Sequence, residues 1–201
     1  MARPQAADYA EKRAAITAAA ARLFARHGYA GAPIAELAAA CGLSKSLLYH
    51  YYGSKDAILF AVMDGHMAEL LEVVDTPPAA DLAPVDAWRA FAEALLTRYA
   101  GAADSQKVLL YDLDHLAADR RAEIVARQRR LIAAAEAKLA AAAARTAGPA
   151  PTRAKLRAQV MLFFGMINWS HTWFDPAHGL SRAELARQAA DTALNGLTIS
   201  I

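Results

Sequence analysis

Apolar residues recur at helical spacing along nearly the whole chain, and no segment alternates apolar and polar residues as a β-strand does. In the first such segment, one face of a predicted helix collects Ile16, Ala19, Ala20, Leu23 and Phe24. That run stops at His27-Gly28, a pair typical of helix ends. Much of the 56% hydrophobic content is alanine and leucine, which favours helices and provides apolar mass for a core. The sequence therefore predicts an all-α fold of about nine helices.

Glycines, prolines and capping residues divide the rest of the chain into helices. Two short helices are predicted over 33–40 and 44–50, and a longer one, capped by Ser54, over 54–75. The remaining predicted helices cover 84–101, 104–117, 119–147, 152–174 and 181–198. Breaks rich in proline or glycine lie at 76–78, 148–151 and 175–179, and Ser181 with Glu184 forms a capping box for the last helix.

The two short helices are joined by Cys41-Gly42-Leu43, as in a helix-turn-helix. Gly42 lies where such a tight turn often needs a positive φ angle. A small core is expected from Ile34, Leu37, Ala38, Leu43, either Leu47 or Leu48, and Tyr52. This packing leaves the first turn and outer surface of the second helix exposed, which is the part that a recognition helix presents to the major groove.

The side chains left exposed there suit DNA. The predicted DNA-binding residues are Ser44, Lys45, Ser46, Leu47, Tyr49, His50 and Lys55. Lys45 can meet a phosphate or a guanine edge, and hydroxyl and imidazole groups can hydrogen-bond phosphates. Leu47 either touches a thymine methyl group or packs, and Ser44 either contacts DNA or serves only as the helix cap. Lys55 adds its charge at the start of the next helix.

Residues 13–60 resemble the DNA-binding domain of TetR-type (TetR/AcrR) transcriptional regulators. The resemblance is carried by AARLFARHGY at 20–29, IAELA at 34–38, GLSK at 42–45, LYHYY at 48–52 and GSKD at 53–56. It implies that a homodimer binds double-stranded operator DNA. We expect a three-helix DNA-binding domain over 1–55, linked through the helix 54–75, and a ligand-binding and dimerisation domain over 56–201. Ala32-Pro33 departs from the family, which often has phosphate-binding hydroxyl residues there.

Charge and cysteine content agree with a DNA-binding head in a reducing compartment. Residues 1–60 carry seven Lys or Arg against four Asp or Glu, whereas the rest of the chain is almost neutral. Cys41 is the only cysteine, so it is either a small buried hydrophobic residue or a redox-sensitive thiol. The apolar stretch 160–167 is too short to span a bilayer, and the N-terminus lacks a signal-peptide pattern. We expect a cytoplasmic protein with no membrane partner.

The C-terminal part is predicted to sense a ligand and to form the dimer. The penultimate predicted helix is apolar on almost all sides, which indicates burial on more than one side. Its apolar residues are Met161, Leu162, Phe163, Phe164, Met166 and Ile167. The last two helices are expected to pair with their copies from a second subunit in a four-helix bundle.

The segment 163–197 resembles TetR-type regulators that respond to acyl-CoA thioesters, through Asn168-Trp169 and the stretch TWFDP at 172–176. This resemblance implies an acyl-CoA or aryl-CoA effector of a catabolic pathway. The predicted ligand-binding residues are Arg120, Arg127 and Arg130 for the phosphates, with Asn168, Trp169, His171 and Trp173 around the acyl group. The arginines can instead form a solvated face balanced by Asp119 and Glu123, and the second group can belong to the core or the dimer interface.

Other functions fit the sequence less well. The chain has no metalloprotease, nucleophile-elbow, P-loop or dinucleotide motif, so no enzyme activity, cofactor or metal site is expected. Asp112 and Asp114 are two residues apart and diverge on a helix, which argues against a shared metal with His115. The alternative that stays open is a TetR-type repressor that senses a hydrophobic drug or free metabolite, for example to control an efflux pump.

Overall fold

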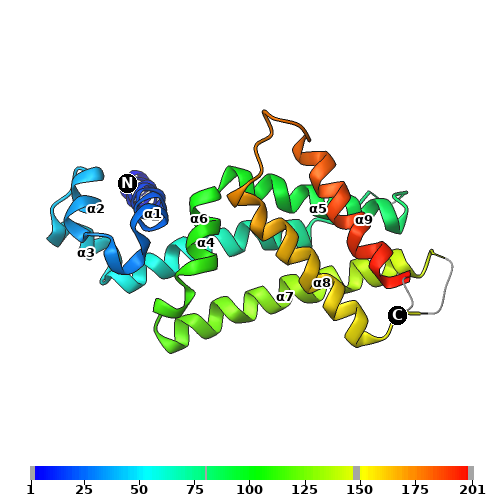
Figure 1. Cartoon of the computed structure of the whole chain (residues 1–201). Helices are drawn as coiled ribbons and strands as arrows, with labels where there is room; N and C mark the ends of the chain where they lie inside the picture. Colours follow the sequence, from blue (N-terminus) through cyan, green and yellow to red (C-terminus); the bar gives the residue numbers. More distant parts are fainter. Residues whose placement is uncertain (1–2, 80, 147–149, 199–201) are drawn as a thin grey trace. The chain divides into compact units, whose positions relative to one another are not determined.

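The computed structural model describes residues 3–79, 81–146 and 150–198, and over these residues it is entirely helical (Figure 1). Its α-helices are α1 (Arg3–Gly31), α2 (Ile34–Ala40), α3 (Lys45–Tyr52), α4 (Lys55–Asp75), α5 (Pro84–Gly101), α6 (Ala103–Tyr111), α7 (Ala118–Ala143), α8 (Arg153–Trp169) and α9 (Arg182–Thr198). Two 3₁₀ turns, η1 (Leu113–His115) and η2 (Ser170–Thr172), follow α6 and α8. The predicted all-α class is confirmed for the described residues. The predicted break at Gly148 and Pro149 lies outside them.

Packing divides the chain into two compact units. The first combines residues 1–68 with 102–126, and the second combines 69–101 with 127–201. α4 and α7 therefore each begin in the first unit and continue into the second. The predicted domain boundary after residue 55 rests on the sequence motif and stays a prediction.

The helix-turn-helix of the first unit folds through local signals that the sequence carries. Gly42 has φ 64°, which a residue with a Cβ rarely adopts, and this turns the chain between α2 and α3. The hydroxyl of Ser44 accepts a hydrogen bond from the Leu47 amide at 3.1 Å, so it caps α3. Leu37 and Leu48 are fully buried beneath the two helices, which settles the choice between Leu47 and Leu48 in favour of Leu48.

The first helix extends further than predicted. α1 begins at Arg3 and continues to Gly31, past the predicted end at His27-Gly28. Gly28, with φ 69° and ψ 157°, breaks the helix at the predicted place, but a further turn forms after it. The first stretch of regular helix therefore ends at Gly28 as predicted, and a separate short turn, which the sequence did not predict, follows up to Gly31.

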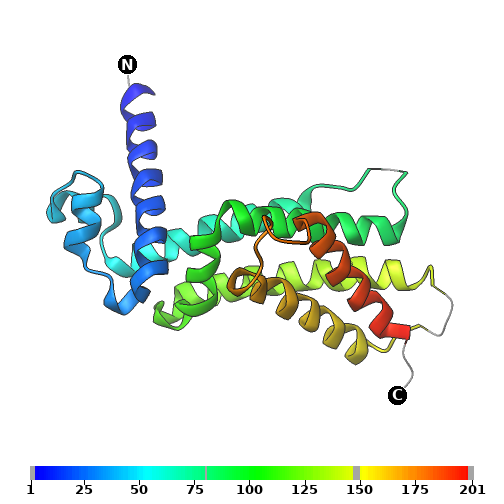
Figure 2. The ribbon, with the colours of Figure 1, turned by 45° about the horizontal axis from the view of Figure 1, so that its top comes forward.

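In the second unit, the core forms where α5, α8 and α9 pack together (Figure 2). Trp88 of α5 is fully buried, and its indole nitrogen donates a 2.9 Å hydrogen bond to the carbonyl of Ala190 on α9. Its ring lies 4.7 Å from that of Phe163 on α8, centroid to centroid. Arg89 adds an ion pair of 2.8 Å with Asp191. These contacts fix α9 against α5 and α8.

Three predicted helices end earlier than expected. The predicted helix 104–117 stops at Tyr111, the predicted helix 119–147 at Ala143, and the predicted helix 152–174 at Trp169. After α8, the side chains of Ser170, His171 and Thr172 each donate a hydrogen bond to the carbonyl three residues earlier. Such local bonds compete with the helical ones and favour the tighter 3₁₀ turn.

Within the described ranges, no helix is both long enough and apolar enough to cross a membrane. The predicted capping box of the last helix is present, with the Ser181 hydroxyl accepting from the Glu184 amide at 3.2 Å. The Glu184 carboxylate in turn accepts from the Ser181 amide at 2.8 Å.

Candidate functional site

α3 presents its first turn and outer face to solvent. Lys45, Ser46 and His50 are exposed, and Leu47 and Tyr49 are exposed apolar or aromatic side chains beside them. On the opposite face, Leu48 and Tyr52 are buried and anchor the helix. The surface holds a cation, hydroxyl and ring donors, and one aliphatic group, which together can contact phosphates and base edges. Whether these residues touch DNA remains a prediction.

Lys55 has an internal role that the sequence did not reveal. Its ammonium donates a 2.5 Å hydrogen bond to the carbonyl of Tyr29 and lies 4.6 Å from the centroid of that ring. Burial lowers the pKa of Lys55, and the charge of Asp112 opposes this change. The side chain is only partly exposed, so a DNA contact from Lys55 would be additional to this internal bond.

Tyr29 is held in place through its backbone amide and through its ring. Its amide donates to the buried carboxylate of Asp112 at 3.0 Å, and its ring packs against those of Phe24 and His115. Burial, and then the charge of Asp56, raises the pKa of Tyr29. The residue that follows the kink in α1 is thus fixed to the end of α6 and the start of α4.

Asp56 makes a second connection within the same unit. One carboxylate oxygen accepts a 2.9 Å hydrogen bond from the Ala117 amide, and the other pairs with Arg120 of α7. The Arg120 guanidinium also lies 5.7 Å from the centroid of the Phe60 ring. The segment from Asp112 to Arg120 is therefore packed onto the start of α4.

α2, the first helix of the helix-turn-helix, begins after Pro33, which has an extended conformation. Among the residues that the structure describes, no side chain caps α2. Cys41 is half-buried, and burial raises the pKa of its thiol. A raised pKa keeps the thiol protonated at neutral pH and favours the packing interpretation over redox sensing.

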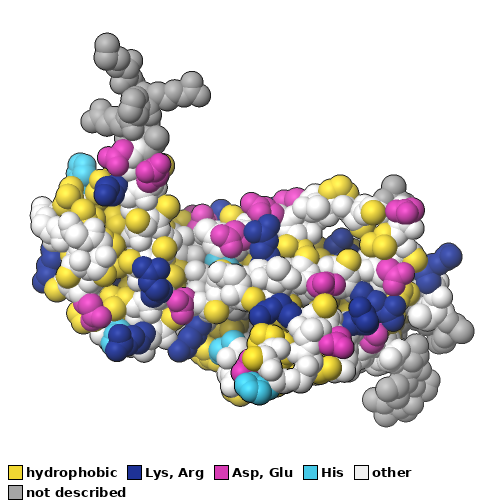
Figure 3. Space-filling model, turned by 90° about the horizontal axis from the view of Figure 1, so that it is seen from above, with side chains coloured by type: hydrophobic (Ala, Val, Ile, Leu, Met, Phe, Trp, Pro, Cys, Tyr) yellow, Lys and Arg dark blue, Asp and Glu magenta, His cyan; other side chains and the backbone are white. Residues whose placement is uncertain are grey.

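Two of the three predicted phosphate-binding arginines already pair with carboxylates. Arg120 belongs to the first unit and pairs with Asp56, whereas Arg127 and Arg130 belong to the second unit. Arg130 pairs with Asp75 of α4. On the face of the molecule in Figure 3, Lys and Arg side chains are interspersed with Asp and Glu. A polyanionic ligand would therefore compete with existing carboxylate partners for two of these arginines.

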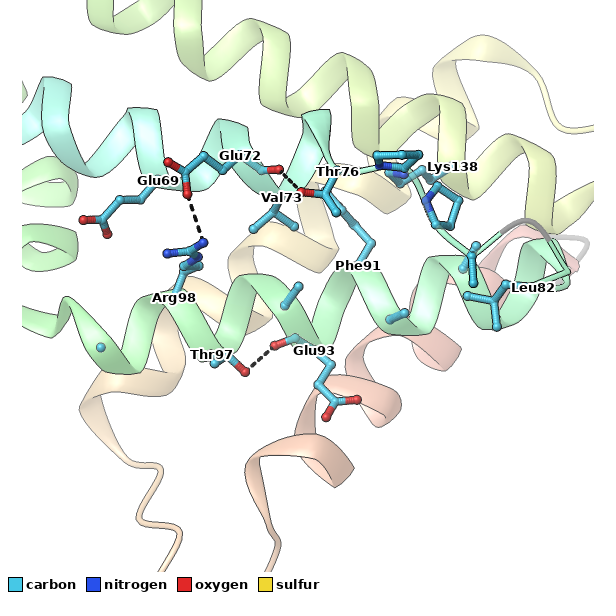
Figure 4. A pocket seen from close by; sticks show the side chains of 17 residues that line it. Glu69, Glu72, Val73, Thr76, Leu82, Phe91, Glu93, Thr97, Arg98 and Lys138 are labelled. Atoms are coloured by element: carbon cyan, nitrogen blue, oxygen red, sulfur yellow. Dashed lines mark hydrogen bonds and ion pairs between the residues drawn. The ribbon is translucent and has the colours of Figure 1, made fainter.

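A cleft of about 920 Å³ lies in the second unit between the end of α4 and α5, and Lys138 of α7 contributes to it (Figure 4). Arg98 pairs with Glu72 at 3.0 Å across the cleft. The Lys138 ammonium lies 5.5 Å from the centroid of the Phe91 ring. Three carboxylates, from Glu69, Glu72 and Glu93, line the cleft against these two cations. The sequence patterns did not identify this cleft, because its residues come from helix faces without a motif.

A second groove, of about 560 Å³, runs between α8 and α9 and is mostly apolar. It brings together two of the predicted acyl-binding residues, Trp169 and Trp173, but Asn168 and His171 do not line it. Leu162 and Trp169 are 59% and 60% exposed, which is unusual for such large apolar side chains. Contiguous exposed apolar surface of this kind marks an interaction site.

Both halves of the chain match known protein families. Residues 16–62 match the family described as "Bacterial regulatory proteins, tetR family". Residues 81–197 match the family described as "Tetracyclin repressor-like, C-terminal domain".

Individual relatives agree with these matches. The HTH-type transcriptional repressor AcnR of Corynebacterium jeikeium is 35% identical over 66 residues, 33% of this chain and 35% of AcnR. The match thus spans about a third of that relative's length. A TetR-family transcriptional regulator from Bordetella parapertussis is 34% identical, with a TM-score of 0.79 over 94% of this chain and 98% of its own. AibR, solved in complex with isovaleryl coenzyme A and operator DNA, is 26% identical, with a TM-score of 0.75 over 90% and 97%.

Proposed function

Because the chain belongs to the tetR family of bacterial regulatory proteins, we propose that it is a dimeric repressor that binds operator DNA through α3 and releases it when a small molecule binds. Members of this family are DNA-binding regulators and not enzymes. The observation that carries the proposal is the arrangement of α3, with Lys45 and Tyr49 exposed above the buried Leu48 and Tyr52. A rigid anchor beneath an exposed polar face is what a recognition helix requires. The proposed place of action is the cytoplasm, where bacterial operator DNA lies.

The groove between α8 and α9 is the proposed dimer interface. Burying Leu162, Trp169 and Trp173 against the same residues of a second copy would remove their exposed apolar surface from water. Such a dimer carries two α3 helices, which need a separation of roughly 34–36 Å to enter successive major grooves. Ligand binding releases DNA only as far as the ligand prefers a conformation in which that separation is wrong.

The proposed effector is an acyl-CoA or aryl-CoA thioester. Two observations support this class: the similarity over nearly the whole chain to AibR, whose complex contains isovaleryl coenzyme A, and the resemblance of the segment 163–197 to acyl-CoA-responsive regulators. Arg127 and Arg130, the two predicted phosphate-binding arginines of the second unit, would contact the phosphates. Arg120 would have to exchange Asp56 for a phosphate.

A second candidate effector is a hydrophobic drug or metabolite without phosphate groups. The cleft in Figure 4 favours this alternative, because Glu69, Glu72 and Glu93 would repel phosphates while Val73 and Phe91 offer apolar contacts. Effectors of the two classes therefore differ in which part of the second unit they would occupy.

Fluorescence anisotropy of labelled DNA from upstream of the protein's own gene tests the proposal. The protein should bind this DNA and a scrambled sequence should not compete. Isovaleryl-CoA and a panel of other acyl- and aryl-CoA thioesters are then titrated, with coenzyme A and the free acids as controls. Release by one thioester alone supports the acyl-CoA proposal. Binding that no thioester disturbs contradicts it and favours the phosphate-free class, and absence of specific binding contradicts the repressor function itself.

A further inference from the structure

A stripe on the N-terminal half of α1 contacts the last turn of α3. Its members, Tyr9, Arg13 and Thr17, are four residues apart and so lie on one face of the helix. The Arg13 guanidinium lies 4.6 Å from the centroid of the Tyr52 ring, and the Thr17 hydroxyl lies 2.6 Å from the Tyr52 hydroxyl. The Tyr52 hydroxyl also donates a 3.0 Å hydrogen bond to the Arg13 carbonyl. These contacts hold the Tyr52 side chain against α1.

Tyr9 extends the same stripe to Tyr51. The two rings stack with centroids 5.0 Å apart and planes inclined by 30°. Tyr51 in turn presents an edge to the His50 ring, at 6.1 Å and 76°. A series of three rings therefore runs from α1 through Tyr51 to His50, a predicted DNA contact.

Neither the buried core nor a family motif accounts for an aromatic side chain at Tyr9. Its side chain is 40% exposed, so it contributes little to the buried core. It also precedes residue 16, where the match to the regulatory family begins, so no family motif assigns it a role. Its ring stacks on Tyr51, the residue next to His50, which is a predicted phosphate contact of α3.

We propose that Tyr9 is a positioning residue for operator binding, which holds Tyr51, and through it His50, in the orientation in which α3 meets the DNA backbone. The inference rests on the proposed operator binding. An aromatic pair restricts the rotamers of both rings before DNA arrives, so less conformational entropy is lost when the complex forms. Tyr9 acts through Tyr51 and not by touching DNA.

The test compares operator binding by the full-length wild-type protein with that of Tyr9→Ala, Tyr9→Phe, Tyr51→Ala and the Tyr9→Ala/Tyr51→Ala double variant. Tyr9→Ala should weaken binding by about three- to tenfold, the range expected for an aromatic pair. Tyr9→Phe keeps the stacked ring and should bind like the wild type. The double variant should bind no more weakly than Tyr51→Ala alone, because both changes break the same contact.

Thermal unfolding of each variant separates positioning from folding, and Tyr9→Ala should unfold near the wild-type temperature because Tyr9 lies outside the buried core. Weakened binding by Tyr9→Phe would show that the hydroxyl touches DNA directly and would overturn the inference. Additive losses in the double variant, or wild-type affinity in Tyr9→Ala, would overturn it as well. Failure of the wild-type protein to bind operator DNA would instead contradict the proposed function, and with it the inference about Tyr9.

Discussion

The carboxylate of Asp112 accepts a hydrogen bond from the backbone amide of Tyr29 at 3.0 Å, although 83 residues separate the two in the chain. Lys55 donates to the carbonyl of the same residue, so both backbone polar groups of Tyr29 are bound by side chains distant in sequence. The end of α6 and the start of α4 are thereby fixed to the turn that follows the kink in α1. Residues outside the helix-turn-helix therefore take part in holding it.

Replacing Asp112 with alanine should destabilise the protein. The change leaves the partly buried Tyr29 amide without its acceptor, and an unsatisfied buried donor costs about 1–3 kcal/mol. Urea unfolding of the two proteins measures the difference. The matched control is Asp114→Ala on the same segment, whose carboxylate is 85% exposed and pairs with Arg121 at the surface. That control should change stability by less than about 1 kcal/mol, and equal losses in the two variants would contradict the role given to Asp112.

The helix-turn-helix was predictable because its signals are local. The cap at Ser44, the turn at Gly42 and the choice of buried faces all depend on residues a few positions apart, and the structure has each of them. The bond between Asp112 and Tyr29 was not predictable, since sequence periodicity contains no information about which distant side chains meet. The same holds for Lys55, which the motif presents as a DNA contact and the fold also uses internally.

The structure of the C-terminal part was less predictable from the sequence than that of the helix-turn-helix. The sequence placed the helices, but the pairing of Arg120 with Asp56 and of Arg130 with Asp75 depends on how those helices pack. The early end of α8 follows from three consecutive side-chain bonds, whose combined effect no single-residue propensity expresses. The cleft of Figure 4 could not be predicted, because it depends on how far apart the helices that line it pack.

Leu162→Glu should convert the proposed dimer to monomers. The side chain lies in the groove between α8 and α9 and is 59% exposed in one chain. A carboxylate there would be buried in the interface and would face its copy across the two-fold axis, which is strongly unfavourable. Sedimentation velocity at micromolar concentration measures the change.

The control for the dimer is Leu82→Glu, because Leu82 is an exposed leucine that lines the other cleft. This variant should sediment as the wild type does. A Leu162→Glu protein that remains dimeric, with unchanged circular dichroism, would contradict the assignment of the groove as the interface.

The capping box of α9 should make stability depend on pH in the acid range. The Ser181 hydroxyl and then its amide lower the pKa of Glu184 below the ordinary value of 4.5. A lowered folded-state pKa means that this stabilisation is present above the ordinary value and is lost as the pH falls through the folded-state pKa. Wild type should therefore be more stable than Glu184→Gln near neutral pH, and the difference should shrink below about pH 4.5.

Thermal unfolding of both proteins across this range measures the effect, with Ser181→Ala as the partner variant. In the Ser181→Ala background, which lacks the hydroxyl donor, Glu184→Gln should have a smaller effect at neutral pH. A difference between wild type and Glu184→Gln that is the same at pH 3 and pH 7 would show that ionisation of Glu184 has no part in capping α9.

Operator binding by the Lys45→Ala/Tyr49→Ala variant tests whether α3 is the helix that binds operator DNA. Both side chains are exposed, so the variant should fold and remain dimeric. Fluorescence anisotropy is measured beside the wild type and Lys107→Ala, which removes an exposed lysine of α6. The double variant should lose specific binding, whereas Lys107→Ala should retain it. Operator binding with wild-type affinity by the folded double variant would contradict the assignment of α3 as the recognition helix.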